Sequence, residues 1–425
     1  MFFYSTRDKN NHKTVSQAIL QGLAEDGGLF VPEYFPQINW AELDPQLSYP
    51  QFAAKILADY FKGDELESQL GEICQNAFNF PLPVKQLNDN TYVMELFQGP
   101  TLSFKDFGAR FLAECMTRLS KNRKTTIIVA TSGDTGSAVA SAFHQKSNVD
   151  VVVMFPKGQI SQRQEKQITC WGDNILAVAV EGTFDDCQKI VKQAFSDEWW
   201  KSRAHLSSAN SINIARLLPQ LTYYAYTSWQ FQLAHNEPAA YIIPTGNVGN
   251  STAAFWAKAM GFPIREIALA TNANRVISDY IAQGKFEPKA SIATIANAMD
   301  VGNPSNFERL RYLFNTWDNF KANVHAISVN DQQIREVIQA VNSQYNYVVC
   351  PHTATAYFAR QQLSPQKWIM VATAAPSKFE TVIEPIIQTK LAVPEQLQIL
   401  LDKPQYLVET QADIKQVQQA LANKA

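Results

Sequence analysis

From Thr91 onward, short apolar segments alternate with stretches of helical periodicity, and this alternation constrains the fold of the 425-residue chain more than any other feature. The apolar segments fall at 91–97, 125–130, 149–155, 241–243, 265–272 and 367–374. Strands that alternate with helices are typical of a largely parallel sheet with right-handed crossovers. The sequence therefore predicts an α/β protein, with ligands bound beyond the carboxyl ends of the strands.

Residues 1–90 have a different, mainly helical pattern. Within 49–61, for example, Phe52, Ile56, Leu57 and Tyr60 share one helical face. The length of 425 residues suggests two or three domains, each with its own core. We predict a helical N-terminal domain at 1–90 and two α/β domains at 91–235 and 236–425, with boundaries that allow segments to interleave.

Composition excludes several classes of protein. The 37 basic and 39 acidic residues give a net charge of −2, which argues against a nucleic-acid surface. No apolar stretch approaches the ~18 residues of a membrane span, and the N-terminus lacks the apolar core of a signal peptide. Five scattered cysteines, none in a C-x-x-C spacing, are typical of reduced thiols. We therefore expect a cytoplasmic protein that binds neither nucleic acid nor membrane.

Two loops rich in glycine and hydroxyl side chains follow strands and precede helices. They are TSGDTGS at 131–137 and TGNVGNST at 245–252. Glycine lets the backbone approach a ligand, and the free N–H groups of a first helical turn favour an anion. Each loop alone is as well explained by an ordinary turn, with Asp134 as a helix cap in the first. Two such loops together predict two anionic groups to be held.

Lys105 begins a predicted amphipathic helix at 104–119, with Ser103 and Asp106 as an expected capping pair. The helix dipole disfavours a cation there, so local structure gives no reason to choose lysine. An amine with a lowered pKa is a good nucleophile toward an aldehyde. A solvated surface lysine is the alternative. With the two loops and the hydroxyl-rich end of the strand at 367–374, which holds Thr373, Lys105 suits a pyridoxal-phosphate site; the geometry of such a site follows only from the resemblance below.

Nine sequence blocks together resemble the threonine synthase family of pyridoxal-phosphate enzymes, in its longer class with an extended N-terminal domain. The blocks include ELFQGPTLSFKDFGARF, ATSGDTGSAVA, SANSINIARLLPQ, PTGNVGN and ATAAPSKF, and they cover nearly the whole chain. The resemblance implies fold type II, with two open, twisted, mostly parallel α/β sheets. It also implies a lyase that completes threonine biosynthesis by converting O-phospho-L-homoserine and water to L-threonine and phosphate.

The resemblance also implies roles for individual residues. Lys105 is implied as the catalytic residue and the attachment point of the cofactor. The other cofactor-binding residues implied are Asp134, Gly246, Asn247, Val248, Gly249, Asn250 and Thr373. The implied substrate-binding residues are Ser132, Gly133, Thr135, Asn210, Ser211, Asn213 and Arg216. An arginine grips an anion bidentately, although a surface position on a helix is the alternative for Arg216.

Two positions depart from the family pattern, since Gln98 and Ala375 stand where histidine is usual, and we expect both near the site. The departures keep open a catalytically silent homologue that binds pyridoxal phosphate. A serine/threonine dehydratase-like lyase of the same fold, which would not need a second phosphate site, is the other alternative. The six histidines form no H-x-x-x-H pair, so no metal site is predicted, and His352 is expected to be a buried, satisfied imidazole. We expect a monomer or a homodimer.

Overall fold

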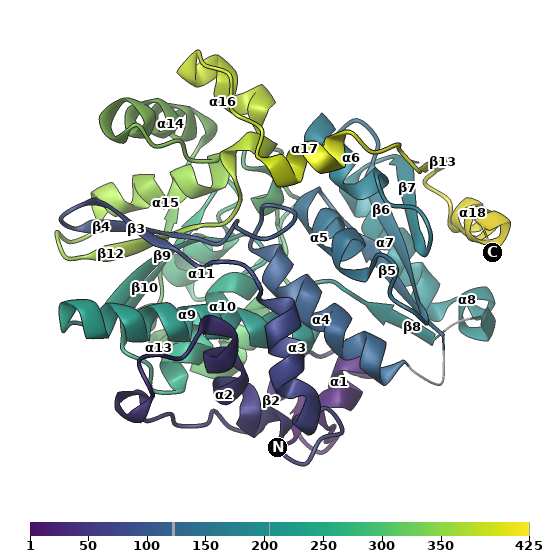
Figure 1. The fold of residues 1–425 in the computed structure, drawn as a ribbon, viewed down its shortest axis with the longest axis horizontal. Coiled ribbons are helices and arrows are strands. Elements are labelled where there is room, and N and C mark those ends of the chain that lie inside the picture. The colour runs from purple at the N-terminus through teal and green to yellow at the C-terminus, as the bar shows by residue number, and fades with distance from the viewer. Residues whose placement is uncertain (121–123, 204, 425) are drawn as a thin grey trace.

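Two open β-sheets form the framework of the computed structural model, which describes residues 1–120, 124–203 and 205–424 (Figure 1). The first sheet has the strand order β13-β7-β6-β5-β8 and is parallel throughout. Its strands are β5 (Thr125–Ala130), β6 (Val149–Pro156), β7 (Ile175–Glu181), β8 (His205–Ser208) and β13 (Val408–Gln411). Buried valine and isoleucine dominate β5 and β6, as expected of strands covered on both faces.

The second sheet has the order β11-β10-β9-β12-β4-β3 and is parallel except for β3, which runs antiparallel to β4. Its strands are β3 (Val84–Asn88), β4 (Thr91–Glu95), β9 (Ala239–Pro244), β10 (Ile264–Thr271), β11 (His325–Ser328) and β12 (Trp368–Ala372). Together the two sheets confirm the predicted fold class and the strands predicted from Thr91 onward.

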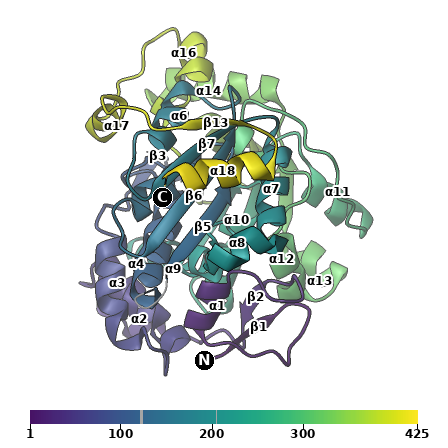
Figure 2. The same ribbon diagram turned by 90° about the vertical axis from the view of Figure 1, so that its right-hand side faces the viewer.

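Helices cover the faces of both sheets (Figures 1 and 2). The N-terminal region holds α1 (Val15–Gln21), α2 (Tyr49–Phe61) and α3 (Leu70–Ala77), beside a small hairpin of β1 (Phe3–Ser5) and β2 (Phe30–Pro32). Helices packed with the first sheet or following it are α4 (Lys105–Leu119), α5 (Asp134–Phe143), α6 (Gln162–Thr169), α7 (Phe184–Ser196), α8 (Glu198–Arg203) and α9 (Ile214–His235). The later helices are α10 (Gly249–Ala259), α11 (Val276–Gln283), α12 (Phe307–Phe314), α13 (Trp317–Asn323), α14 (Asp331–Tyr345), α15 (Pro351–Gln362), α16 (Glu380–Ile387), α17 (Glu395–Leu401) and α18 (Ile414–Lys424).

The predicted helix at 49–61 is present as α2, and its four predicted core residues are all buried. Phe52 stacks on Trp229 of α9 with ring centroids 5.2 Å apart, so α2 is packed against the longest helix of the chain. This contact fixes the N-terminal region onto the body of the protein by burial of aromatic surface.

The strands of each sheet are not consecutive in the chain. Strands β3 and β4 precede the first sheet in sequence but belong to the second, whereas β13, near the C-terminus, belongs to the first. Each sheet therefore depends on chain from both halves of the sequence. The domain boundaries near 90 and 235 stay predictions, since sheet membership does not follow them.

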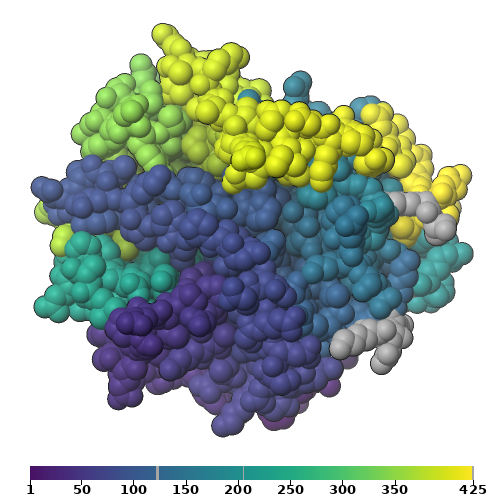
Figure 3. Space-filling view, in the orientation of Figure 1, coloured from purple at the N-terminus to yellow at the C-terminus, as the bar shows by residue number. Residues whose placement is uncertain are grey.

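The C-terminal segment crosses from the second sheet to the first over the loop that precedes Lys105. Leu397 of α17 is fully buried against Leu102 and Ala375, and β13 then pairs with β7. In the space-filling view this segment (yellow) lies across residues of the earlier chain (Figure 3). The chain end therefore helps to hold the two sheets and the 97–103 loop together.

Replacing Leu397 with alanine should lower the free energy of unfolding by about 2–4 kcal/mol, because it removes buried methyl groups and leaves a cavity. Ile399 lies on the same helix but is 54% exposed, so Ile399→Ala should cost less than about 0.5 kcal/mol. Urea denaturation of the two variants measures both values. Equal effects would show that α17 is not held through Leu397.

Candidate active site

The amine of Lys105 lies at the first residue of α4, inside the protein. Its Nζ is 3.8 Å from Oδ2 of Asp134 and 5.4 Å from the centre of the Phe104 ring, and the side chain is 14% exposed. Burial lowers the pKa of Lys105 to about 8, against the opposing effect of Asp134 and with the help of the nearby cations Lys378 and Arg216. Lys105 is therefore not a solvated surface lysine.

The expected capping pair of Ser103 and Asp106 is wrong. Phe104 holds the N-cap position without a side-chain hydrogen bond, and the buried Ser103 hydroxyl has no partner within the described parts of the chain. Asp106 instead accepts hydrogen bonds from the backbone N–H and the hydroxyl of Thr101, at 2.9 and 2.6 Å. Its carboxylate closes the preceding turn, where Gly99 packs so tightly that a Cβ would lie 2.5 Å from Oδ2.

Asp134 is the first residue of α5, directly after the glycine of the SGDTG loop. Its carboxylate is buried and accepts hydrogen bonds from Lys378 Nζ at 2.8 Å and Gln164 Nε2 at 2.9 Å. Burial would raise the pKa of Asp134, but the charges of Lys378 and Lys105 hold it well below its usual range. Asp134 is therefore a permanent anion between two lysines.

The GNVGN loop joins β9 to α10, as predicted, and its backbone is shaped for a close ligand. A Cβ on Gly246 would lie 2.6 Å from Cα of Met299, and Val248 adopts the left-handed conformation with φ of 47°. Helix α10 starts at Gly249, so its free N–H groups point out of the loop. The side-chain Oδ1 of Asn250 accepts from the hydroxyls of Tyr223 at 2.5 Å and Tyr224 at 2.8 Å.

The SANSIN segment lies between the loops. Ser211 accepts a hydrogen bond from Asn247 Nδ2 at 2.6 Å, which connects this segment to the GNVGN loop. Asn213 caps α9 and donates to the carbonyls of Ile19 and Ser208, so its amide group is fully used, whereas Asn210 is half-buried beside the cap.

Arg216 is 2% exposed, donates to the carbonyl of Ala209, and has an Nε without a partner among the described residues. Burial lowers the pKa of Arg216 to about 10.

The remaining predicted residues lie in the SGDTG loop and at the end of β12. Ser132 and Thr135 are half-buried, and their hydroxyls make no hydrogen bond to the parts of the chain that the structure describes. Gly133 has φ of 132° and lies against Gln164. Thr373 directly follows β12, and its carbonyl accepts from the N–H of Phe104 at 2.8 Å. The structure therefore brings the end of β12, the SGDTG loop and Lys105 to one place.

The two positions that depart from the family pattern flank this place. Gln98 donates to the buried carboxylate of Glu95 at 2.8 Å, which also accepts from Tyr347 and Lys85. Ala375 is buried two residues after Thr373 and donates its N–H to the carbonyl of Leu102. Gln98 therefore belongs to a carboxylate network, and Ala375 to an apolar contact.

His352 is buried, as expected, with its Nε2 accepting from the N–H of Ala298 at 3.1 Å. Burial lowers the pKa of His352 to about 4, so its imidazole is neutral near pH 7. Among the described residues, no group of three His, Cys, Asp or Glu side chains is placed to hold a metal ion.

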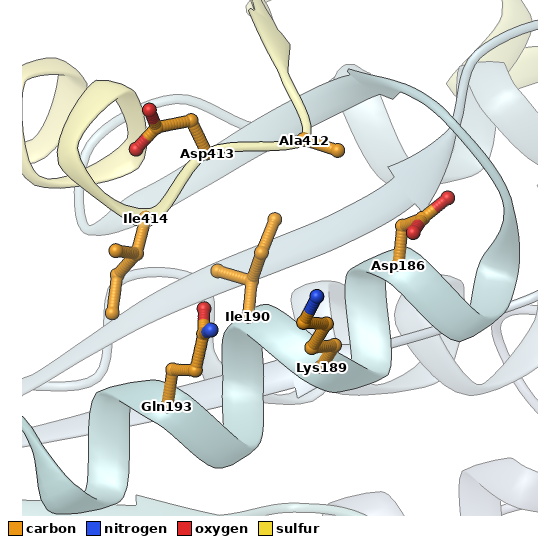
Figure 4. Close-up of a pocket in the computed structure, with 7 residues that line it drawn as sticks. All are labelled: Asp186, Lys189, Ile190, Gln193, Ala412, Asp413 and Ile414. Carbon is orange, nitrogen blue, oxygen red and sulfur yellow. The ribbon is translucent and has the colours of Figure 1, made fainter.

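A separate surface hollow lies between α7 and the connection from β13 to α18, and it holds none of the predicted site residues (Figure 4).

Sequence reasoning missed Lys378 and Gln164, the two partners of Asp134. Lys378 lies in the quoted block ATAAPSKF, five residues after Thr373, and a second lysine at the end of a strand was the available signal. Gln164 lies in α6, outside every quoted block, and only the three-dimensional packing brings it to Asp134.

The residues present fit a phosphate-bearing aldehyde. A lysine of lowered pKa supplies the amine, and the first turn of α10 supplies backbone N–H groups beside a glycine that admits no side chain. Asn250 Nδ2 and Arg216 Nε are buried polar atoms without partners among the described residues, as expected where anionic ligands complete the bonding.

No described helix is long and apolar enough to cross a membrane.

Comparisons with known proteins identify similar chains over the full length. Residues 77–373 match the family described as pyridoxal-phosphate dependent enzyme. Residues 2–78 match the threonine synthase N terminus, and residues 349–421 match the threonine synthase C-terminal family. The chain is 40% identical to threonine synthase of Haemophilus influenzae, over 93% of this chain and 94% of that one. It is 38% identical to threonine synthase of Escherichia coli over the whole of both chains.

Solved structures agree with these matches. The crystal structure of threonine synthase from Escherichia coli superposes with a TM-score of 0.92 at 39% identity, over all of both chains. The structure titled PLP bound threonine synthase from Brucella melitensis has a TM-score of 0.93 at 30% identity and covers 100% of this chain and 99% of that one. A pyridoxal 5'-phosphate-dependent aspartate racemase, 15% identical with a TM-score of 0.55, shares the fold alone.

The lowered pKa of His352 predicts acid sensitivity. In the unfolded chain His352 binds a proton near pH 6.5, whereas in the folded protein it does so only near pH 4. The free energy of unfolding therefore decreases as pH falls through this window. Between pH 7 and 5 the loss should be about 2 kcal/mol, and His352→Gln, which keeps an acceptor for Ala298, should remove it. Urea titrations at both pH values measure it. The exposed His325 is the control, and an equal change in His325→Gln would contradict the assignment.

Proposed function

This chain belongs to the threonine synthase family, and we propose that it converts O-phospho-L-homoserine and water into L-threonine and phosphate. It is a pyridoxal-phosphate-dependent lyase. The single observation that carries the proposal is the buried amine of Lys105, 3.8 Å from Asp134, in a chain that matches the family from end to end.

The cofactor would be held by groups from three places in the fold. Backbone N–H groups of the 246–250 loop and the start of α10 would bind its phosphate, and the Lys105 amine would be its point of attachment. Asp134 lies beside that amine as an anion, and Thr373, at the end of β12, would offer its hydroxyl to the ring nitrogen. When bound, the cofactor ring supplies an electron sink for carbanion character at the substrate.

A second anion site accepts the substrate. Arg216 provides a buried guanidinium with an unpartnered Nε among the described residues, which suits a phosphate or carboxylate. Ser132, Thr135 and Asn210 are half-buried and supply polar hydrogen atoms. Asn213 caps α9 and thereby holds Arg216 in place, while Ser211 contacts the cofactor loop through Asn247. Gly133 lets the SGDTG backbone pass against Gln164.

Lys105 moves the protons of the reaction. When it is not attached to the cofactor, Lys105 has a pKa of about 8, so about one amine in ten is neutral at pH 7 and its Nζ can accept the proton from Cα of the substrate. The flexible stem of lysine lets Nζ take a second proton from Cβ and deliver one at Cγ, where phosphate has left. Water adds its hydroxyl at Cβ in place of the hydrogen removed there, a proton returns to Cα, and the remaining proton of the water goes to the released phosphate. The Cγ–O bond is broken, a Cβ–O bond is formed, and the products are L-threonine and phosphate.

The setting of the enzyme follows the sequence expectations. We propose a cytoplasmic enzyme that acts on a small molecule as a monomer or a homodimer. The balanced charge of −2 and the reduced state expected of five buried cysteines support this setting.

Lys105→Ala should lose the absorbance of the lysine-bound cofactor and lower threonine formation from O-phospho-L-homoserine by at least about 1,000-fold, because both the attachment and the proton carrier disappear. Phosphate and threonine release measured together checks the reaction. In the unmodified protein, borohydride reduction followed by peptide mapping should place the cofactor label on the SFKDF peptide, which contains Lys105. Turnover of L-threonine but not of O-phospho-L-homoserine would instead identify a dehydratase, and loading without any turnover would identify a silent homologue.

Gly246→Ala should weaken binding of the cofactor by at least about tenfold, because the added Cβ would lie 2.6 Å from the Met299 backbone and force the loop open. Cofactor titration of the apoenzyme, followed by absorbance, measures the affinity. Gly71→Ala is the matched control, because a Cβ there meets nothing within 4 Å. Unchanged affinity in Gly246→Ala would remove this loop from the cofactor site.

A further inference from the structure

Lys378 is a fully buried cation at the junction of the two sheets. It ends the short 3₁₀ helix 376–378 that follows β12, and its side chain is 0% exposed. Its Nζ donates to Oδ1 of Asp134 at 2.8 Å and to the carbonyl of Thr101 at 2.7 Å. A buried lysine needs such partners, since an unpaired ammonium in the interior is costly.

The backbone around Lys378 is held from the side of the first sheet. Its carbonyl accepts from the Ser161 hydroxyl at 3.0 Å, and the carbonyl of Ser377 accepts from Arg163 at 2.5 Å. Both donors lie at the start of α6, which also supplies Gln164 to Asp134. Position 378 is therefore fixed by its main chain and by its amine, and the ammonium group cannot move away from Asp134 without breaking these contacts.

The carboxylate of Asp134 is shared unequally between two lysines. Its Oδ1 is within hydrogen-bond distance of Lys378 and Gln164, whereas Oδ2 is 3.8 Å from Lys105, beyond a hydrogen bond. A carboxylate bound in this way already has a close cationic partner, Lys378. Lys105 therefore lies beside an anion that is committed elsewhere.

We propose that Lys378 is a positioning residue that binds the Asp134 carboxylate, prevents it from forming a close ion pair with Lys105, and so keeps the Lys105 amine available to react. The inference rests on the proposed function, in which Lys105 carries the cofactor and moves protons. Without Lys378, Asp134 would be free to pair with Lys105 and to stabilise its ammonium form. An ammonium nitrogen has no lone pair with which to attack an aldehyde or accept a proton.

Other charged and titratable groups near Lys105 do not replace this effect. Those that influence it are Asp134 on α5, Lys378 after β12, Arg216 on α9, Cys350 before α15 and His352 on α15. Burial has the largest effect on the pKa of Lys105 and lowers it. Asp134 has the next largest effect and raises it, and Lys378 is the nearby charge that lowers it most. Arg216 acts in the same direction more weakly, and His352 is neutral near pH 7.

The test measures the titration of Lys105 in the full-length protein without added cofactor. Trace acetic anhydride labels neutral amines only, and mass spectrometry of the SFKDF peptide over a series from about pH 6 to 11 gives the midpoint of Lys105. In Lys378→Met we expect the neutral fraction of Lys105 at pH 7 to fall by at least about tenfold, because a like charge is lost and a carboxylate is released. In Asp134→Asn we expect the opposite shift.

Two further variants separate positioning from general damage. Lys378→Arg keeps the charge and should leave the midpoint near that of the unmodified protein. Lys258→Met removes a different partly buried lysine, which donates to the carbonyl of Arg265 at 2.7 Å outside the site, and should leave the Lys105 midpoint unchanged. Circular dichroism confirms that each variant is folded before labelling.

A midpoint of Lys105 that is unchanged in Lys378→Met, or raised in Asp134→Asn, overturns the inference. If Lys378→Met does not fold, Lys378→Gln decides, since it also removes the buried charge and must raise the midpoint. Failure of the proposed function is seen separately, as borohydride labelling outside the SFKDF peptide or absence of threonine formation. The acetylation result does not depend on either, because no cofactor or substrate is present.

Discussion

The carboxylate of Asp134 is the constraint on which the site depends. It is a buried anion between Lys105 and Lys378, and it joins the SGDTG loop of one sheet to the end of β12 in the other. The charges of Lys378 and Lys105 hold its pKa well below the usual range, so it is ionised near neutral pH. The two sheets are therefore joined at the point where the chemistry takes place, by an interaction that also sets the state of the reactive amine.

The architecture explains why these residues can meet. In parallel sheets the carboxyl ends of all strands lie along one edge, so the loops after β5, β9 and β12 project into the space between the two sheets. Helices α4, α5 and α10 begin there and present their positive ends. A site with two phosphate groups to bind gains from such an edge. The same field disfavours the ammonium form of Lys105, so fold and chemistry point in one direction.

Sequence reasoning predicted the strands, the two loops and Lys105, because each is a local pattern with a physical meaning. It failed at one local choice and where the deciding contact is distant in the chain. Locally, the cap expected from Ser103 and Asp106 is absent because Asp106 bonds to Thr101 instead. Nothing in the sequence around Lys378 apart from its charge indicates a role in the site, and that role depends on Asp134, which lies 244 residues earlier in the chain. The mostly exposed β3 was hidden in a region of helical pattern.

The pairing of β13 with β7 has a consequence for biosynthesis of the polypeptide. On the ribosome, β7 emerges with its outer edge unpaired, and its permanent neighbour is translated only after more than half of the chain has followed. An open strand edge is a template for pairing with other chains. The nascent first sheet is thus exposed to self-association until translation is nearly complete, and a premature stop before residue 408 would leave that edge uncovered.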